Sequence, residues 1–154
     1  MDRIKKKYAF PDGFSLAVPV EDAHIYQPKF VTLYKDALIV GLCLSLYPLA
    51  RDLLIFLSID LRQLTPNGWR FLMGVIYLWP QWFRYDLPFQ EFMWSYRPFS
   101  LFGEVGFFSL QARQGRKIIN RCPSNNKGWN QKYFHVPTLG LCEESPVGHP
   151  LPIA

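Results

Sequence analysis

The 154-residue chain is predicted to adopt an α+β fold, with a helical N-terminal half packed on a small antiparallel sheet in the C-terminal half. Apolar residues recur at helical spacing between prolines up to about residue 96. After Phe99, short apolar runs are separated by polar turns, which is typical of strands. Hydrophobic residues make up 49% of the chain and aromatic residues 17%, enough to bury a core. We therefore expect a single folded domain.

Three segments are expected along the chain. Residues 1–28 are predicted to form an irregular basic arm, since prolines and a glycine limit regular structure there. Residues 29–137 form the single domain, and residues 138–154 form a flexible tail rich in proline and glycine. The dense basic run of the arm suits phosphate contacts, nuclear import or simple solvation, and it consists of Arg3, Lys5, Lys6 and Lys7.

The first two helices are predicted on either side of Pro48. Apolar positions at helical spacing favour a helix over residues 29–46 that enters the core. Proline cannot continue that helix, but it suits the first turn of a new one. A second helix is therefore expected over residues 48–58, with its apolar stripe formed by Leu49, Leu53, Phe56 and Leu57.

A third helix is predicted over residues 66–78, because Thr65 is a good N-cap and Pro66 suits the first helical position. Its expected buried stripe is Trp69, Leu72, Met73 and Ile76. A short fourth helix is expected over residues 89–96. The aromatic residues between 79 and 96 favour a core over a binding platform, because no basic residues are interleaved with them; they are Trp79, Trp82, Phe83, Tyr85, Phe89, Phe92, Trp94 and Tyr96.

Three strands are predicted in the second half. Residues 103–110 and 117–120 are joined by the polar turn Gln114–Gly115, and a third strand covers residues 132–136. Pro137 is expected to end it. These strands would make the small antiparallel sheet.

The formal charge of +5 favours an anionic partner such as nucleic acid, although the charge is spread thinly along the chain. Basic residues around the predicted sheet are the candidates for phosphate contacts. These candidates are Arg113, Arg116, Lys117, Arg121, Lys127 and Lys132.

Cysteine usage and hydropathy indicate an intracellular protein, nuclear or cytoplasmic. The three cysteines are widely spaced, which suits a reducing compartment, and no secretory signal is visible. Cys43 is expected to be a small buried hydrophobic residue. The apolar stretch from Ala37 to Leu57 is broken near its middle by Pro48, Arg51 and Asp52, so two core helices explain it better than a membrane span.

No catalytic residue, cofactor, metal ion or small-molecule substrate is predicted. The glycine-rich turn of nucleotide-binding enzymes does not occur, and neither do Cys or His pairs at zinc-ligand spacing. Acidic residues do not cluster as a two-metal nuclease requires. Cys122 and His135 could meet on adjacent strands as nucleophile and base, but three cysteines and three histidines give such pairs by chance.

Three motifs carry a resemblance to a known family: GLCLSLYPL at residues 41–49, QLTPNGWRFLMG at 63–74 and KGWNQKYFHV at 127–136. In this order and spacing they resemble the plant "putative gypsy-type transposon" domain, also labelled transposase (putative) gypsy type, across residues 12–137. The middle motif is the most specific. Phe107–Leu110 is similar to the phenylalanine-rich strand of that family.

The resemblance implies a retrotransposon-derived, gag-like structural or interaction domain that self-associates, and the missing catalytic groups indicate that it has no catalytic role. The alternative is a nucleic-acid-binding module whose affinity falls with salt. A transposase or nuclease activity is implied only by the family label. Asn130 stands where the family usually has lysine, which weakens a basic contact there. Family members generally continue into long charged segments, so this chain is expected to be a truncated copy.

Overall fold

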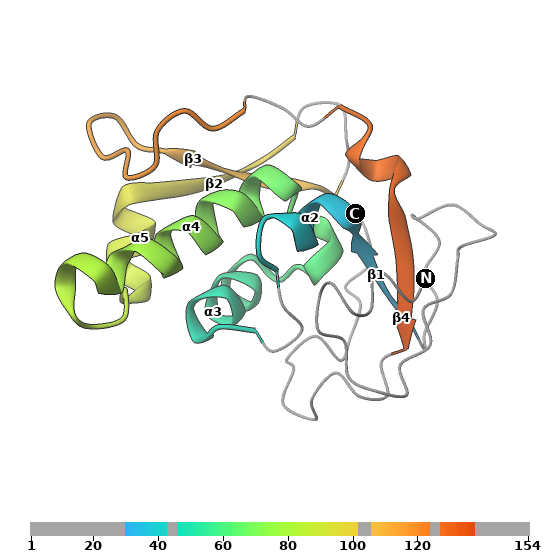
Figure 1. Cartoon of the computed structure of the whole chain (residues 1–154), viewed down its shortest axis with the longest axis horizontal. Helices are drawn as coiled ribbons and strands as arrows, with labels where there is room; N and C mark the ends of the chain where they lie inside the picture. The colour runs from blue at the N-terminus through green and yellow to red at the C-terminus, as the bar shows by residue number, and fades with distance from the viewer. Residues whose placement is uncertain (1–29, 43–45, 102–105, 124–126, 138–154) are drawn as a thin grey trace.

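The computed structural model describes residues 30–42, 46–101, 106–123 and 127–137, and all that follows refers to them (Figure 1). The fold is α+β, as predicted, with helices mostly before the sheet formed by β2 and β3. The elements follow one another as β1 (Phe30–Tyr34), α2 (Lys35–Ile39), α3 (Pro48–Leu57), η1 (Leu61–Gln63), α4 (Pro66–Phe83), α5 (Phe89–Ser95), β2 (Tyr96–Ser100), β3 (Phe108–Ala112), η2 (Trp129–Gln131) and β4 (Tyr133–Pro137).

Among the described residues, strand pairing produces two separate antiparallel sheets of two strands each, β1 with β4 and β2 with β3. In the first, Leu33 lies opposite Phe134, about a hundred residues further along the chain. In the second, Tyr96 lies opposite Ala112. The expectation of a single sheet in the second half is therefore wrong for β4, whose partner lies at the start of the domain.

Residues 29–46 do not form the predicted helix, because the segment begins with strand β1 and continues as the short helix α2. Thr32, Leu33 and Tyr34 are all buried, so buried and exposed positions do not alternate along the strand. Without that alternation, the sequence pattern of the strand cannot be told from that of a buried helix. Its β-branched and aromatic residues favour a strand. Gly41 has a φ of 108°, which ends the helical segment.

Helices α3 and α4 begin where the prolines predict. Pro48 occupies the first turn of α3. Thr65 caps α4, where its hydroxyl accepts a hydrogen bond of 3.2 Å from the Gly68 N–H. Phe56 was expected in the buried stripe of α3, but it is 59% exposed. It lies at the edge of the buried face of the helix, which is formed by Leu49, Ala50, Leu53 and Leu54.

Helix α4 continues past the predicted end at residue 78 to Phe83. Pro80 lies inside it and is exposed, so the helix tolerates the missing N–H on its solvent side. Trp69 and Leu72 are fully buried as predicted, and Val75 takes the deep position that Met73 and Ile76 were expected to share. The stripe of α4 is thus set by one helical face that rotates slightly from the predicted one.

The core lies on both sides of α4, which runs between the β2–β3 sheet and α3 (Figure 1). Trp69 is buried at its centre and donates its indole N–H to the Leu61 carbonyl at 3.3 Å. Phe92 and Tyr96 stack with ring centroids 5.3 Å apart. Helix α5 ends at Ser95, close to the predicted end at residue 96, and the chain continues directly into strand β2, which was not predicted.

Residues 117–120 do not form the predicted strand. The backbone N–H groups of Ile118 and Ile119 donate to the Tyr96 hydroxyl, each at 3.3 Å, instead of joining a ladder. The strand predicted at 103–110 is observed as β3, shifted to Phe108–Ala112, and residues 102–105 lie outside the described ranges. The basic arm, Cys43, Cys142 and the tail from residue 138 also lie outside them.

Candidate functional site

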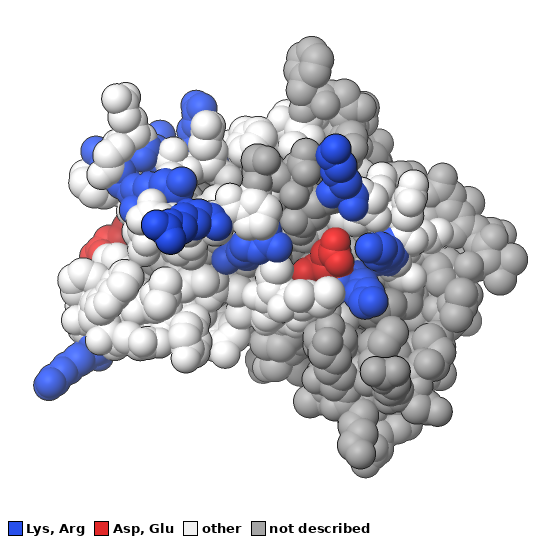
Figure 2. Space-filling model, turned by 45° about the horizontal axis from the view of Figure 1, so that its top comes forward, with Lys and Arg blue, Asp and Glu red and all other residues white. Residues whose placement is uncertain are grey.

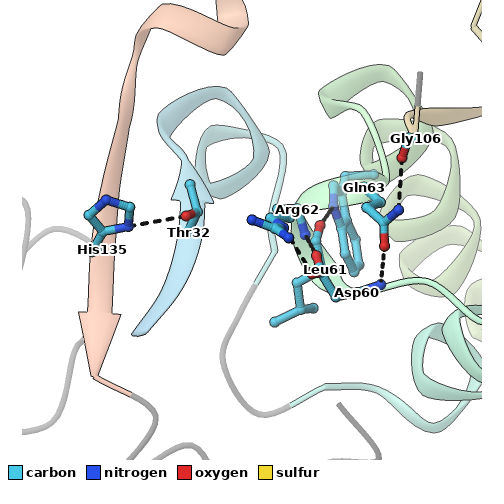
Figure 3. Close-up of polar contacts among 8 residues, drawn as sticks. Thr32, Asp60, Leu61, Arg62, Gln63, Gly106 and His135 are labelled. Carbon is cyan, nitrogen blue, oxygen red and sulfur yellow. Dashed lines mark hydrogen bonds and ion pairs between the residues drawn. The ribbon is translucent and has the colours of Figure 1, made fainter. Parts of the chain in front are cut away.

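The most specific motif, residues 63–74, is used to join elements of the fold. The Gln63 side-chain amide donates to the Gly106 carbonyl at 3.0 Å, and its oxygen accepts from the Asp60 N–H at 3.0 Å (Figure 3). The Thr65 N–H donates to the Phe108 carbonyl at 2.8 Å. The motif thereby links η1, α4 and β3, so its polar groups are already satisfied within the domain.

Asp60 and Arg62 form a buried ion pair beside this junction, with Nε and Oδ2 2.9 Å apart (Figure 3). The second carboxylate oxygen of Asp60 accepts from the Arg62 N–H at 2.8 Å. Burial raises the pKa of Asp60, and the adjacent guanidinium and hydrogen bonds act against that rise. Because both carboxylate oxygens are engaged within η1, this acid stabilises a turn and is not poised as a catalytic base.

Other residues of the motif also have structural roles, through hydrogen bonds and packing. The Asn67 side chain donates to the Pro123 carbonyl at 3.0 Å and accepts a hydrogen bond from Arg70, which ties α4 to the loop after Arg121. A Cβ on Gly68 would lie 2.7 Å from Cδ1 of the fully buried Leu64. A structural role therefore accounts for this motif, as its proline, asparagine and tryptophan suggest.

Cys122 and His135 do not lie on adjacent strands. Cys122 lies in the loop after β3, outside any strand, whereas His135 is buried in β4. The His135 Nδ1 and the Thr32 hydroxyl are 3.1 Å apart, which links the two strands of that sheet (Figure 3). Within the described ranges, no group of three or more His, Cys, Asp or Glu residues is placed to hold a metal ion.

The six basic candidates fall into separate groups. Arg113, Arg116 and Lys117 lie on the turn that follows β3, and Lys127 and Lys132 flank η2 beside the other sheet. Figure 2 shows Lys and Arg side chains gathered over the end of the molecule with β2 and β3, and a smaller group toward the opposite end. Arg121 lies between them in sequence, with a φ of 58°. The structure therefore does not form one continuous site from all six.

Two of these arginines are fixed by the C-terminal end of α5, where helix carbonyls lack partners. Arg113 donates from Nε to the Met93 carbonyl at 3.1 Å, and Arg116 donates to the Trp94 carbonyl at 2.9 Å. The Arg113 N–H also donates to Ser95 at 2.8 Å. Cations at this end complement the helix dipole. Each guanidinium has five N–H donors, so each keeps donors for another group.

Sequence reasoning missed three residues next to this turn. Arg97 lies on β2 and holds Gln111 of β3, with the shorter hydrogen bond at 2.7 Å. Phe99, two residues on, shares that exposed face of the strand. Trp94 is 62% exposed, and the Arg116 guanidinium lies 3.3 Å from its ring centroid. The sequence signal that could have pointed to this surface is the charge imbalance, since residues 92–137 contain seven Lys or Arg and one acid, Glu104.

A second exposed surface, the aromatic corner, lies at the end of α4 and consists of Trp79, Trp82, Phe83 and Tyr85. Trp79 stacks on Phe83 with centroids 4.2 Å apart, and Tyr85 lies edge-on to Trp79 at 6.1 Å. Trp82, Phe83 and Tyr85 are 58%, 45% and 49% exposed. The prediction that this aromatic stretch forms core holds for Phe92 and Tyr96, and Trp79 and Phe89 pack against that core. It is wrong for the exposed rings, which are Trp82, Phe83, Tyr85 and Trp94.

The buried indole N–H of Trp79 has no hydrogen-bond partner among the described residues. Trp82 is seven residues after Val75 and therefore lies on the same face of α4. The stripe that forms the core thus continues along the helix into solvent. Arg84 and Asp86, both exposed and of opposite charge, flank the corner.

A family model described as "Putative gypsy type transposon" matches residues 31–100. The match confirms the resemblance over the first two motifs and does not bear on the third motif or on a plant origin. No curated protein matches the chain, and no solved structure does. No helix within the described residues is both long and apolar enough to cross a membrane.

Proposed function

Because residues 31–100 match the gypsy-type transposon family, we propose that the chain is a non-catalytic, gag-like structural or interaction domain that self-associates. The observation that carries this proposal is the aromatic corner, where the apolar stripe of α4 continues past the core. Large exposed apolar patches often mark interaction sites. The groups of the specific motif satisfy each other within the domain, which supports an assembly role over a chemical one.

A second copy of the chain is the partner that fits this corner. A two-fold contact places the same surface on both partners, so Arg84 of each copy can approach Asp86 of the other. The corner therefore carries charges that complement themselves, unlike the basic surface near β2.

The exposed area of the aromatic corner sets the expected strength of self-association. Trp82, Phe83 and Tyr85 together expose about 300 Å² if each full side chain contributes about 200 Å². A standard interface buries about 800 Å² on each partner, so these rings supply less than half of one. We expect weak, concentration-dependent association rather than an obligate dimer.

The test is the mass of the purified chain by light scattering across a concentration series. The proposal predicts that the mean mass rises with concentration, at low and at high salt, because the contact is mainly apolar. A mass that stays at the monomer value up to the solubility limit would contradict it.

The second candidate function is nucleic-acid binding, favoured by the basic residues between 92 and 137. If phosphate contacts drive it, affinity must fall steeply as salt increases. An affinity that does not change with salt would remove this candidate. A transposase or nuclease activity is a third possibility, and metal-dependent strand cleavage abolished by replacing one specific acid would support it.

A further inference from the structure

We propose that Trp94, the outer face of β2 and the turn after β3 together form a binding site for single-stranded nucleic acid. We call this the β2–β3 basic surface, and it consists of Trp94, Arg97, Phe99, Arg113, Arg116 and Lys117. The inference deepens the second candidate function and does not depend on self-association. Its basis is the combination of positive charge, exposed aromatic rings and preformed geometry on one part of the surface.

Charge is the first argument. Among the described residues after Glu91 there are seven Lys or Arg and no Asp or Glu. Four of the seven lie on β2 or on the turn after β3, where the gathered basic side chains are visible in Figure 2. Such a surface complements a phosphate backbone and disfavours a second copy of this basic chain.

Preorganisation is the second argument. Arg113 and Arg116 each use one donor to cap α5, and Arg97 is held by Gln111. A side chain that is already fixed loses less conformational freedom when it binds. The terminal N–H groups that these bonds leave over remain available, because guanidinium carries five donors. The capping hydrogen bonds therefore orient the arginine side chains and leave further N–H donors for a ligand.

Exposed rings are the third argument, and they favour a single strand over a duplex. Arg116 covers one face of the Trp94 ring, yet the residue remains 62% exposed, so the other face is open for stacking. Phe99 is exposed on β2 two residues from Arg97. Unpaired bases stack on such rings, and a stacked guanidinium adds a cation–π contribution. Bases in a duplex are stacked on each other and cannot reach these rings.

The test is fluorescence anisotropy with a fluorescein-labelled dT15 strand, and with a duplex of equal length, at several salt concentrations. We expect the wild-type chain to bind the single strand more tightly than the duplex. Trp94→Ala should weaken binding by about 5- to 150-fold, the range measured when a stacking ring is removed. The double variant Arg97→Gln/Lys117→Gln should lower the salt slope by about 1.4, given about 0.7 per phosphate contact on a single strand.

The matched control is Lys127→Gln/Lys132→Gln, which removes two exposed charges beside η2 and should leave the affinity close to wild type. Thermal unfolding of each variant checks that the fold is intact, and light scattering reports whether self-association is unchanged. Equal binding of strand and duplex, no effect of Trp94→Ala, or an equal loss in the control would overturn the site. Displacement of dT15 by polyglutamate at equal charge concentration would also overturn it, because it would indicate a general anion surface.

Discussion

Replacing Tyr96 with Phe should destabilise the domain, because it removes one buried hydroxyl oxygen. The Tyr96 hydroxyl accepts the N–H groups of Ile118 and Ile119, each at 3.3 Å, and the residue is fully buried. Tyr96→Phe keeps the ring, its stacking on Phe92 and its volume, but it leaves two backbone donors without a partner. Burial also raises the pKa of this hydroxyl, so it remains protonated at neutral pH.

The magnitude follows from the two lost acceptor contacts. A hydrogen bond contributes about 0.5–1.5 kcal/mol net, and an orphaned buried donor costs about 1–3 kcal/mol. Ile118 and Ile119 are only half-buried, so water can reach part of that loop and the lower values apply. We expect a total loss of about 1–3 kcal/mol, which lowers Tm by about 3–9 °C for a chain of this size.

Urea unfolding followed by circular dichroism measures this loss, and the m-value should not change because the exposed surface is the same. The matched control is Tyr77→Phe, since Tyr77 is 72% exposed and should lose less than about 0.5 kcal/mol. Equal stabilities for Tyr96→Phe and the wild type would refute the role assigned to the hydroxyl. A large loss in the Tyr77 variant would show that the comparison is not specific.

Four further substitutions test the junction around the 63–74 motif. Gly68→Ala should cost about 1–3 kcal/mol, because the new Cβ would lie 2.7 Å from the buried Leu64 side chain. Gly74→Ala should be close to neutral, since only the tip of the half-buried Ile119 side chain must move and alanine favours a helix. Equal losses of stability for the two variants in thermal unfolding would contradict this. Thr65→Ala should cost about 1 kcal/mol by removing the N-cap of α4, and an unchanged unfolding midpoint in urea would argue against the cap. Because the folded pKa of Asp60 is raised above its ordinary value, its contribution is fully present below pH 3.8 and is lost as the pH rises through the folded pKa. The stability of the wild type relative to Asp60→Asn should therefore fall between acidic and neutral pH, and a difference that grows over that range would contradict the burial of this carboxyl.

Local signals in the sequence predicted the helices well. Pro48 and the Thr65–Pro66 pair act within their own first turns, so the starts of α3 and α4 follow from neighbouring residues. The end of α4 could not be predicted in the same way, because Pro80 reads as a break and is tolerated only on an exposed side.

Strands that depend on distant partners were not predicted. β1 is buried and pairs with β4 about a hundred residues away, which no local pattern contains. β2 contains Pro98 and follows α5 without a loop, so it lacks turn signals. Ile118 and Ile119 look like a strand in sequence, but the Tyr96 hydroxyl satisfies their N–H groups.

The candidate site was predicted only in part. Basic composition indicated Arg113, Arg116 and Lys117, which do lie on one turn. It did not show that two of them cap α5, because the carbonyls they bind are about twenty residues away in the chain. Trp94 and Arg97 were missed because the first was expected in the core and the second lies outside the basic stretch of the predicted sheet.

Sedimentation velocity on paired variants tests the assembly role most directly. Trp82→Ser/Tyr85→Ser removes two rings of the aromatic corner, and Tyr77→Ser removes one exposed ring from the opposite side of α4. If the corner mediates self-association, the wild-type chain and the Tyr77 variant should sediment faster as concentration rises, while the double variant remains a monomer. Equal concentration dependence in all three chains, or a monomer throughout, would contradict the proposed function.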